Sequence, residues 1–296
     1  MVNVKIGVIG IPGKWSTEIL ADHVERLTGF RLVIDMAHIH LDLVSNHLYF
    51  NDYDLCQLDA LIVKKISAQY SPNTLDRLEL LRIVEAAGTR IFSTPERIMR
   101  LINRLSCTIT LRNAGIPMPP TVITEDIKAA TDAVMAFGSA VFKPLYSTKA
   151  QGMCVIESGE REQIEEQVGK FHVNNPMMYI QQKVNLPGKD LGLVFLGGEY
   201  LGTYARISGG ESWNTTIKEG GKYAAYTPSK ELIELGQKAQ SLFKMDFTTV
   251  DIAESDMGPI VFEVSAFGGF RGSMEGMGID AAEHYANYVL DKINYD

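Results

Sequence analysis

The chain has 296 residues, enough for about two domains of ordinary size. Hydrophobic residues make up 46% and charged residues 22%, an ordinary globular composition. The net charge of −8 argues against general binding of nucleic acids, because their phosphates require a basic protein face. A local basic pocket for a nucleotide is compatible with this balance.

The cysteines and the N-terminus indicate the compartment. Cys56, Cys107 and Cys154 lie far apart and show neither a disulfide framework nor the spacing of a zinc site. Such usage is typical of a reducing cytoplasm. The apolar run 4–9 is too short for a signal peptide, and no apolar run of ~20 residues is present. We therefore expect a cytoplasmic protein without a membrane span.

The first part of the chain alternates strand-type and helix-type segments, which is typical of a mostly parallel α/β sheet. Strands are predicted at 4–9, 30–34, 60–63 and 90–92, and amphipathic helices at 16–27 and 73–87. The turn GIPGKWS after the first strand departs from the P-loop pattern twice, at Val8 and at Trp15. We therefore expect a strand-to-helix turn without nucleotide chemistry.

The rest of the chain predicts α+β structure. An extended Pro-rich segment, 116–120, favours a hinge between modules. Helices are predicted at 94–99, 101–114, 127–137, 163–171, 228–243 and 280–293. Strands are predicted at 140–144, 153–156, 178–181, 191–196 and 199–207, with a polar loop at 146–152. Arg100 and Arg104 lie one helical turn apart and are expected to share a face, usually a solvated one.

The stretch 249–276 predicts a hairpin that carries two carboxylates. Asp251 and Glu263 each stand between apolar strand neighbours, and the turn 254–259 separates them. If both acids lie on one face they repel, and a hard divalent cation such as Mg²⁺ is the usual remedy. The run 265–272 is expected to be a Gly-rich loop that lets backbone approach a ligand. The alternative is a surface hairpin whose acids face water.

Further polar residues are candidates for chemistry. Lys143 ends an apolar strand, where a lysine either meets an anion or extends into solvent. Lys149 follows in the polar loop and reaches a phosphate if that loop folds down. Arg206 lies on a strand, where the alternative is an ordinary surface arginine, and Asn214 lies in a polar, Gly-rich stretch typical of a functional loop.

The order of these features resembles the ATP-grasp superfamily, and most closely the RimK-type carboxylate–amine ligases. From residue 140 onward the chain gives a strand lysine, a loop, the strand edge IQQKV, an arginine strand, an asparagine loop and the two-carboxylate hairpin. The resemblance extends from Glu96 to the C-terminus. It implies an ATP-grasp fold, in which an N-terminal parallel α/β domain precedes two α+β subdomains that sandwich ATP. The implied boundaries are 1–95, 96–180 with the phosphate loop, and 181–296 with the metal site.

The resemblance also implies roles for individual residues. Those implied to bind ATP are Arg104, Lys143, Lys149, Gln182, Val184, Asp190 and Asn214. Those implied to hold Mg²⁺ or Mn²⁺ are Asp251, Glu263 and Ser265. Arg206 is implied to act near the transferred phosphoryl and acyl groups.

Four departures from the family pattern concern the substrate more than ATP. Ser265 replaces an asparagine and is a weaker metal ligand, and Arg104 replaces a lysine, which keeps the charge but changes the shape. The loop 146–152 has one glycine where the family has several, and Gly192 stands where RimK-type proteins carry an arginine. The stretches IGVIGIPGKWS and KPLYSTKAQGMCVI add a narrower resemblance, to the ATP-grasp proteins of the bacterial GAK gene system.

The resemblance implies an ATP-dependent ligase that joins a carboxylate to an amine through an acyl phosphate. The partners would be a small-molecule or peptide carboxylate and an amine acceptor, and relatives commonly form homo-oligomers. One alternative is an ATP-grasp kinase that phosphorylates a hydroxyl or a sugar-like substrate. The other, supported by Ser265, is a regulatory protein that binds ATP without catalysis.

Overall fold

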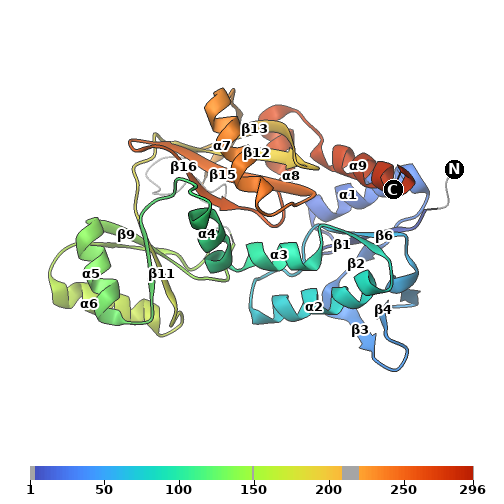
Figure 1. Ribbon diagram of the computed structural model, residues 1–296, viewed down its shortest axis with the longest axis horizontal. Coiled ribbons are helices and arrows are strands. Elements are labelled where there is room, and N and C mark those ends of the chain that lie inside the picture. The colour runs from blue at the N-terminus through green and yellow to red at the C-terminus, as the bar shows by residue number, and fades with distance from the viewer. Residues whose placement is uncertain (1–3, 149, 209–219, 296) are drawn as a thin grey trace.

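Three main sheets follow one another along the chain in the computed structural model, which describes residues 4–148, 150–208 and 220–295. Figure 1 shows the N-terminal sheet at the right, the C-terminal sheet at the top and the central sheet with its two helices as a lobe at the left. A search of the described helices finds none with the length and apolar character needed to cross a membrane.

The N-terminal sheet is parallel, as predicted, with strand order β2-β1-β6-β7. Successive residues of a strand point to opposite faces of the sheet. Both faces of this sheet are buried because helices cover each of them. Ile9 and Leu61 belong to the core with α2, whereas Val8 and Ile62 belong to the core with α1 and α9. The elements are β1 (Ile6–Ile9), α1 (Trp15–Thr28), β2 (Val33–Ile34), β6 (Ala60–Val63), α2 (Pro72–Ala86) and β7 (Arg90–Phe92).

The turn between β1 and α1 shows why this segment is no P-loop. The backbone N–H of Gly13 donates to Glu18 Oε1 at 2.6 Å, and that of Ile11 donates to Thr17 Oγ1 at 3.2 Å. Side chains of α1 thus accept the N–H groups that a P-loop offers to phosphates. The predicted strand-to-helix turn is confirmed.

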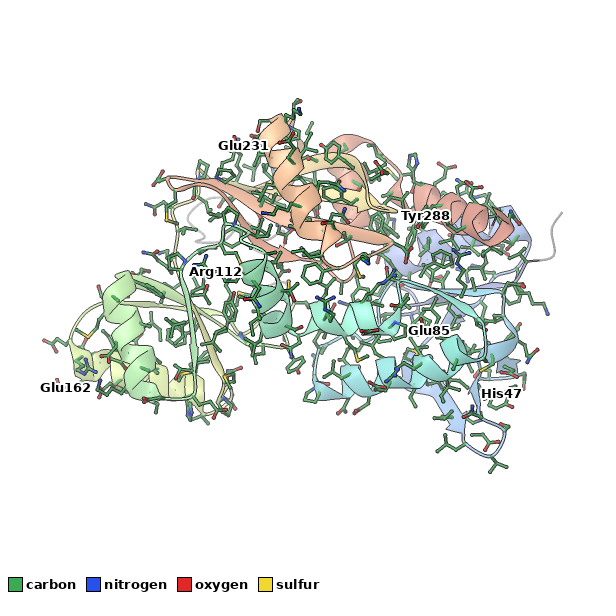
Figure 2. The ribbon with its side chains drawn as sticks, viewed as in Figure 1. His47, Glu85, Arg112, Glu162, Glu231 and Tyr288 are labelled. Atoms are coloured by element: carbon green, nitrogen blue, oxygen red, sulfur yellow. The ribbon has the colours of Figure 1, made fainter. Side chains whose placement is uncertain are left out.

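A small antiparallel sheet lies between β2 and β6, in a region for which the sequence analysis predicted no element. Its strands are β3 (Ile39–Asp42), β4 (His47–Phe50) and β5 (Tyr53–Asp54), flanked by the short 3₁₀ helices η1 (Met36–His38) and η2 (Leu55–Gln57). Figure 2 places His47 of this sheet at the end of the molecule opposite Glu162 of the central lobe.

The central sheet is antiparallel, and its two faces differ in chemistry. Its strand order is β10-β9-β11-β8. The helices α5 and α6 cover one face, on which the strands place apolar residues such as Phe142 and Ile180. Lys143, Tyr179 and Gln181 alternate with these residues along their strands and therefore point to the opposite face. The elements are β8 (Thr121–Thr124), α5 (Ile127–Phe137), β9 (Ser139–Lys143), β10 (Cys154–Glu157), α6 (Arg161–His172) and β11 (Met178–Gln182).

The C-terminal sheet is antiparallel with order β14-β13-β12-β15-β16. The prediction of a Gly-rich loop over 265–272 is wrong for its last residues, because the helix α8 begins at Phe270. The hydroxyl of Tyr288 on α9, labelled in Figure 2, donates to Asp246 Oδ1 at 3.0 Å. This bond ties the last helix to the segment before β15. The elements are β12 (Lys189–Leu196), β13 (Glu199–Ile207), β14 (Lys222–Ala225), α7 (Lys230–Ser241), β15 (Phe247–Ser255), β16 (Gly258–Val264), α8 (Phe270–Met277) and α9 (Ala281–Tyr295).

Two short helices connect the N-terminal and central sheets, α3 (Pro95–Ile102) and α4 (Arg104–Asn113). Asn103 separates them, because its side chain accepts the backbone N–H groups of Leu105 and Ser106 and thereby caps α4. Arg100 and Arg104 therefore lie on different helices, and the prediction that they share a solvated face is wrong. The cap turns Arg104 inward, and 10% of its side chain is exposed.

Lys64, directly after β6, joins the N-terminal sheet to the segment after β16. Its Nζ donates to the carbonyl oxygen of Gly268 at 2.5 Å and lies 3.8 Å from the centre of the Phe270 ring. No carboxylate oxygen of the described residues lies within 4.0 Å of this buried amine. Burial, and secondarily the charge of Lys65, lowers the pKa of Lys64 from 10.5 to about 7.

The lowered pKa of Lys64 predicts a pH effect on stability. Between the folded and the unfolded pKa the unfolded chain binds one more proton at this residue, so stability rises with pH across that interval. In Lys64→Met this contribution is absent. The unfolding free energy of the wild type minus that of the variant should grow by on the order of 4 kcal/mol between about pH 7 and pH 10. Urea unfolding of both proteins at several pH values measures it, and parallel curves would contradict the prediction.

Candidate active site

The hairpin predicted around the two carboxylates is formed by β15 and β16. Asp251 and Glu263 are direct cross-strand partners in its antiparallel ladder. Opposite residues of such a pair point to the same face of a sheet. The side chain of Asp251 is 14% exposed and that of Glu263 is 40% exposed, so the surface-hairpin alternative is wrong for Asp251.

Asp251 belongs to a network across three neighbouring strands. In the ladder Asp190 of β12 is opposite Arg206 of β13, and Gly192 of β12 is opposite Asp251. Arg206 Nε donates to both carboxylate oxygens of Asp190 at 3.1 Å, and Arg206 Nη2 lies 3.1 Å from Asp251 Oδ2. One buried guanidinium thus joins two buried acids.

Only one of the two carboxylate oxygens of Asp251 is paired within the described part of the chain. Its Oδ1 is buried and has no hydrogen-bond partner among the described residues. Burial, reinforced by the charges of Glu263 and Asp190 and opposed by Arg206, raises the pKa of Asp251 to about 7. An orphaned carboxylate oxygen of this kind is a natural ligand for a bound cation.

Glu263 faces basic groups that come from the other side of the site. Arg104 Nη1 donates to Glu263 Oε2 at 3.0 Å, while Arg104 Nε donates to the carbonyl of Pro144 at 3.3 Å. Lys143 lies nearby on β9, where its Nζ donates to Gln181 Oε1 at 2.6 Å. Burial first, and Arg104 second, lowers the pKa of Lys143 to about 7. An anion bound here would restore the charge of the amine.

The balance of charges fits a divalent cation. The carboxyl groups of Asp190, Asp251 and Glu263 face two guanidiniums. A bound cation would favour the charged form of Asp251, whose pKa burial raises. Ser265 lies two residues beyond Glu263, and its backbone is fixed because its N–H donates to Thr249 O at 2.8 Å. The donor set is therefore all oxygen, which is what Mg²⁺ and Mn²⁺ prefer.

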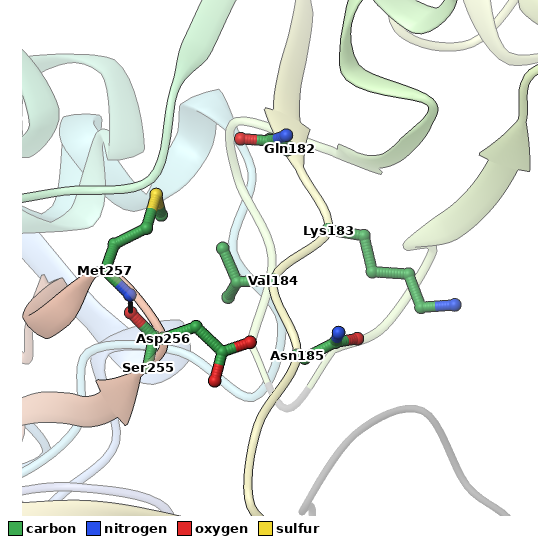
Figure 3. Close-up of a pocket in the computed structure, with 7 residues that line it drawn as sticks. All are labelled: Gln182, Lys183, Val184, Asn185, Ser255, Asp256 and Met257. Carbon is green, nitrogen blue, oxygen red and sulfur yellow. Dashed lines mark hydrogen bonds between the residues drawn. The ribbon is translucent and has the colours of Figure 1, made fainter.

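A second part of the site lies where the segment after β11 passes the turn between β15 and β16. A cavity of about 160 Å³ is lined by Gln182, Lys183, Val184, Asn185, Ser255, Asp256 and Met257. Figure 3 shows the side chain of Val184 pointing toward this turn, whereas Lys183 points the other way. Among the described residues neither backbone polar group of Val184 takes part in a backbone hydrogen bond. Both groups are therefore available to a ligand, as the predicted adenine edge requires.

Comparison with known proteins identifies the family to which this fold and site belong. The model of the RimK-like ATP-grasp domain matches residues 102–289. The chain belongs to the RimK-like ATP-grasp family. It is 26% identical to the tetrahydromethanopterin:alpha-L-glutamate ligase of Methanosarcina acetivorans, over 96% of this chain and 98% of that protein. It is 24% identical to the glutamate--LysW ligase ArgX of Sulfolobus acidocaldarius, over 89% and 98% of the two chains.

Solved structures agree on the fold of this RimK-like protein. The ATP-grasp ligase PsnB, complexed with a minimal precursor, superimposes with a TM-score of 0.76 at 16% identity over 98% of this chain and all of that chain. Another PsnB structure, with a TM-score of 0.73 at 17% identity over 99% of each chain, contains Mg and ADP. The predicted ATP-grasp fold and the predicted ATP-dependent carbon–nitrogen ligase class are confirmed.

The RimK-like protein departs from the family pattern at Gly192 for a packing reason. A Cβ atom at this position would overlap the ring of Tyr204, which also covers Gly272 and Gly276 of α8. Tyr204 is buried against α8 and thus fills the space next to Gly192. A side chain at position 192 and an aromatic ring at position 204 exclude each other.

Gly192→Ala should therefore destabilise this protein. The added methyl group must displace Tyr204 from a packed core, which costs about 1–3 kcal/mol of unfolding free energy. Gly159→Ala is the matched control, because nothing lies within 4 Å of its added Cβ. Urea unfolding measures both variants, and Tyr204→Leu should relieve part of the cost in Gly192→Ala. Equal stability of the two alanine variants would contradict the overlap.

The structure brings six of the predicted site residues into contact networks, and it places Gln182 and Val184 at a separate cavity. Arg104, Lys143, Asp190, Arg206, Asp251 and Glu263 form the networks described above. Lys149 and Asn214 lie outside the described residues. Gln181, the partner of Lys143, was not among the predicted residues. Lys64 and Lys65 were not predicted either, because adjacent lysines after a strand normally indicate solvent.

Proposed function

We propose that this protein forms an amide bond between a carboxylate and an α-amino acid of the L-glutamate type, at the expense of ATP. The relatives in two archaea bear the names of glutamate ligases, which supports the amine substrate. The observation that carries the proposal is the pairing of Asp251 with Glu263 beside two arginines and a lysine. Such a centre suits the transfer of a phosphoryl group, because positioning and charge neutralisation provide most of the acceleration.

The proposed reaction has two steps. A carboxylate oxygen attacks the γ-phosphorus of ATP, and the bond from that phosphorus to the bridging oxygen breaks. ADP departs, and the carboxylate has become an acyl phosphate. The amine then attacks the acyl carbon, the bond from that carbon to the phosphate oxygen breaks, and inorganic phosphate leaves as the nitrogen loses a proton. The chain needs no nucleophile of its own for either step.

Individual residues take distinct parts in this proposal. Asp251 and Glu263, with Ser265, would hold Mg²⁺, which neutralises charge on the phosphates when bound. Lys143 and Arg104 would bind the phosphates, and their partners Gln181 and Glu263 keep them directed into the site.

Arg206 would stabilise the charge that develops during both transfers. Val184 would present its backbone groups to the adenine, and Gln182 would present its carbonyl oxygen, because its N–H donates to Pro120 O at 2.8 Å. Asp190 would bind the ribose. In the structure Asp190 accepts from Arg206, so ribose binding shares this carboxylate with the guanidinium. Lys149 and Asn214 are proposed to contact ATP by family resemblance alone.

We also propose the domain boundaries 1–95, 96–180 and 181–296. Each range contains most or all of one of the main sheets, and the chain crosses between ranges at the start of α3 and within β11. ATP would lie between the second and third parts, where β9 and β16 bring Lys143 and Phe262 within 5.4 Å of each other, measured from Nζ to the ring centre.

An isotope experiment tests the proposed reaction. Carboxylic acids that carry ¹⁸O in the carboxylate are incubated with the protein, ATP, Mg²⁺ and L-glutamate. A ligase transfers one ¹⁸O atom from the carboxylate to the released phosphate, because the acyl phosphate breaks at its carbon–oxygen bond. A kinase would release ADP with a phosphate ester and no labelled phosphate. Binding of ATP without any release of ADP would support the regulatory alternative.

A further inference from the structure

The N-terminal sheet carries two adjacent lysines at its carboxyl edge. Lys64 and Lys65 follow β6 directly, and their backbone N–H groups donate to Ile9 O at 2.9 and 3.2 Å. They therefore lie at the carboxyl ends of the parallel strands β1 and β6. Ligands of open α/β sheets bind outside the carboxyl ends of the strands.

Lys64 fixes the segment after Glu263 against this end of the sheet. Its amine binds the carbonyl oxygen of Gly268 and lies over the ring of Phe270. A Cβ atom at Gly268 would meet Thr248 backbone at 3.0 Å and the Phe247 ring at 2.5 Å, so the loop packs closely on β15. The N-terminal sheet and the metal-binding hairpin thus hold the same loop from two sides.

Lys65 contacts the same loop at Phe267. Its Nζ donates to the hydroxyl of Tyr70 at 3.0 Å and lies 5.4 Å from the ring centre of Phe267. The rings of Tyr70 and Phe267 meet edge to face at 6.3 Å. Lys65 is partly buried among these groups, which fix the direction of its amine.

Tyr70 connects this position with the reaction centre. The ring of Tyr70 packs against Phe267, which lies two residues beyond Ser265, a proposed metal ligand. The amine of Lys65 is hydrogen-bonded to the hydroxyl of Tyr70. The amine of Lys65 thus lies beside the loop that follows the proposed metal ligands.

We propose that Lys65, held by Tyr70 and Phe267, binds a carboxylate group of the substrate, and that Lys64 is a positioning residue for the loop. This inference rests on the proposed function and deepens it, because it assigns recognition of the substrate to the N-terminal sheet. A carboxylate of this kind is present both on an amino acid and on the acid that is phosphorylated. The two sources share one chemistry and are separated by experiment.

The experiment measures binding of two probes to the full chain loaded with AMPPNP and Mg²⁺. L-Glutamate carries an amine and carboxylates, whereas glutarate carries carboxylates alone. Lys65→Met should weaken binding of at least one probe about tenfold or more, because a hydrogen bond to a charged group is lost. Lys65→Arg keeps the charge and should restore most of the affinity. Lys128→Met, on the exposed face of α5, is the matched control and should bind both probes as the wild type does.

Each outcome decides a separate point. Weakened binding of glutarate assigns Lys65 to the acid that is phosphorylated, and weakened binding of L-glutamate alone assigns it to the amine substrate. Unchanged binding of both probes by Lys65→Met, with affinity for AMPPNP intact, overturns the inference and leaves the proposed function standing. A wild-type protein that binds AMPPNP but neither probe also overturns the inference, whereas one that binds no AMPPNP overturns the proposed function.

Discussion

Replacing Asp251 by asparagine is expected to lower turnover on the order of 10³-fold, equal to about 4 kcal/mol of transition-state stabilisation. The amide keeps the shape of the side chain but removes the negative charge that the proposed Mg²⁺ site requires. Glu263→Gln should have an effect of the same size, because Glu263 is the cross-strand partner of Asp251. Rates of ADP release at rising Mg²⁺ concentration measure both variants.

Stability should behave differently from turnover in Asp251→Asn. Within the described ranges the Oδ1 atom of Asp251 has no hydrogen-bond partner, and burial raises the pKa of this carboxyl, so its charge is costly in the folded state. Removing that charge should leave the unfolding free energy unchanged within about 1 kcal/mol, since Arg206 keeps Asp190 as a partner. Active sites often reduce the stability of the folded state because catalysis requires such charged groups.

The control for this pair of measurements is Glu199→Gln. Glu199 is an exposed acid at the start of β13, outside the networks of the proposed site. Its replacement should alter neither turnover nor stability. If Asp251→Asn retained its turnover, the carboxylate would have no part in holding the metal. If turnover and stability fell together, the loss of activity would follow from unfolding.

The features that could be predicted from the sequence are those set by local pattern. β6, β7 and α5 have the predicted bounds because continuous apolar runs and a capped amphipathic segment determine them without help from distant residues. The facing carboxylates were predictable for a similar reason, because a hairpin couples its strands through one short turn.

The features that the sequence concealed depend on distant contacts. β8 and β14 are short strands that pair with β11 and β13, so their own residues give a weak signal. The glycines of α8 indicated a loop, but Gly272 and Gly276 are required by the ring of Tyr204, which lies far away in sequence. Lys64 likewise acquires its role from Gly268, a residue 204 positions later.

Replacing Arg206 by methionine is expected to give the largest loss of stability in the site, about 3–5 kcal/mol. Arg206 is the guanidinium that compensates both Asp190 and Asp251, whose side chains are 8% and 14% exposed. Methionine fills similar space but removes the guanidinium that these two buried carboxylates share. Urea unfolding near neutral pH measures the loss. The loss should shrink from about pH 8 to about pH 5, because protonation neutralises the stranded carboxylates.

Arg161→Met is the matched control for that loss. Arg161 also bridges two carboxylates, Asp132 at 2.7 Å and Glu165 at 3.1 Å, but 41% of its side chain is exposed, so its replacement should cost less than about 1 kcal/mol. Adding Asp190→Asn to Arg206→Met should recover part of the stability, because one stranded charge is then removed. If the second substitution recovered nothing, the cost would come from lost packing of the arginine side chain. Because solvent already compensates Asp132 and Glu165, burial of the paired acids is what separates the two arginines.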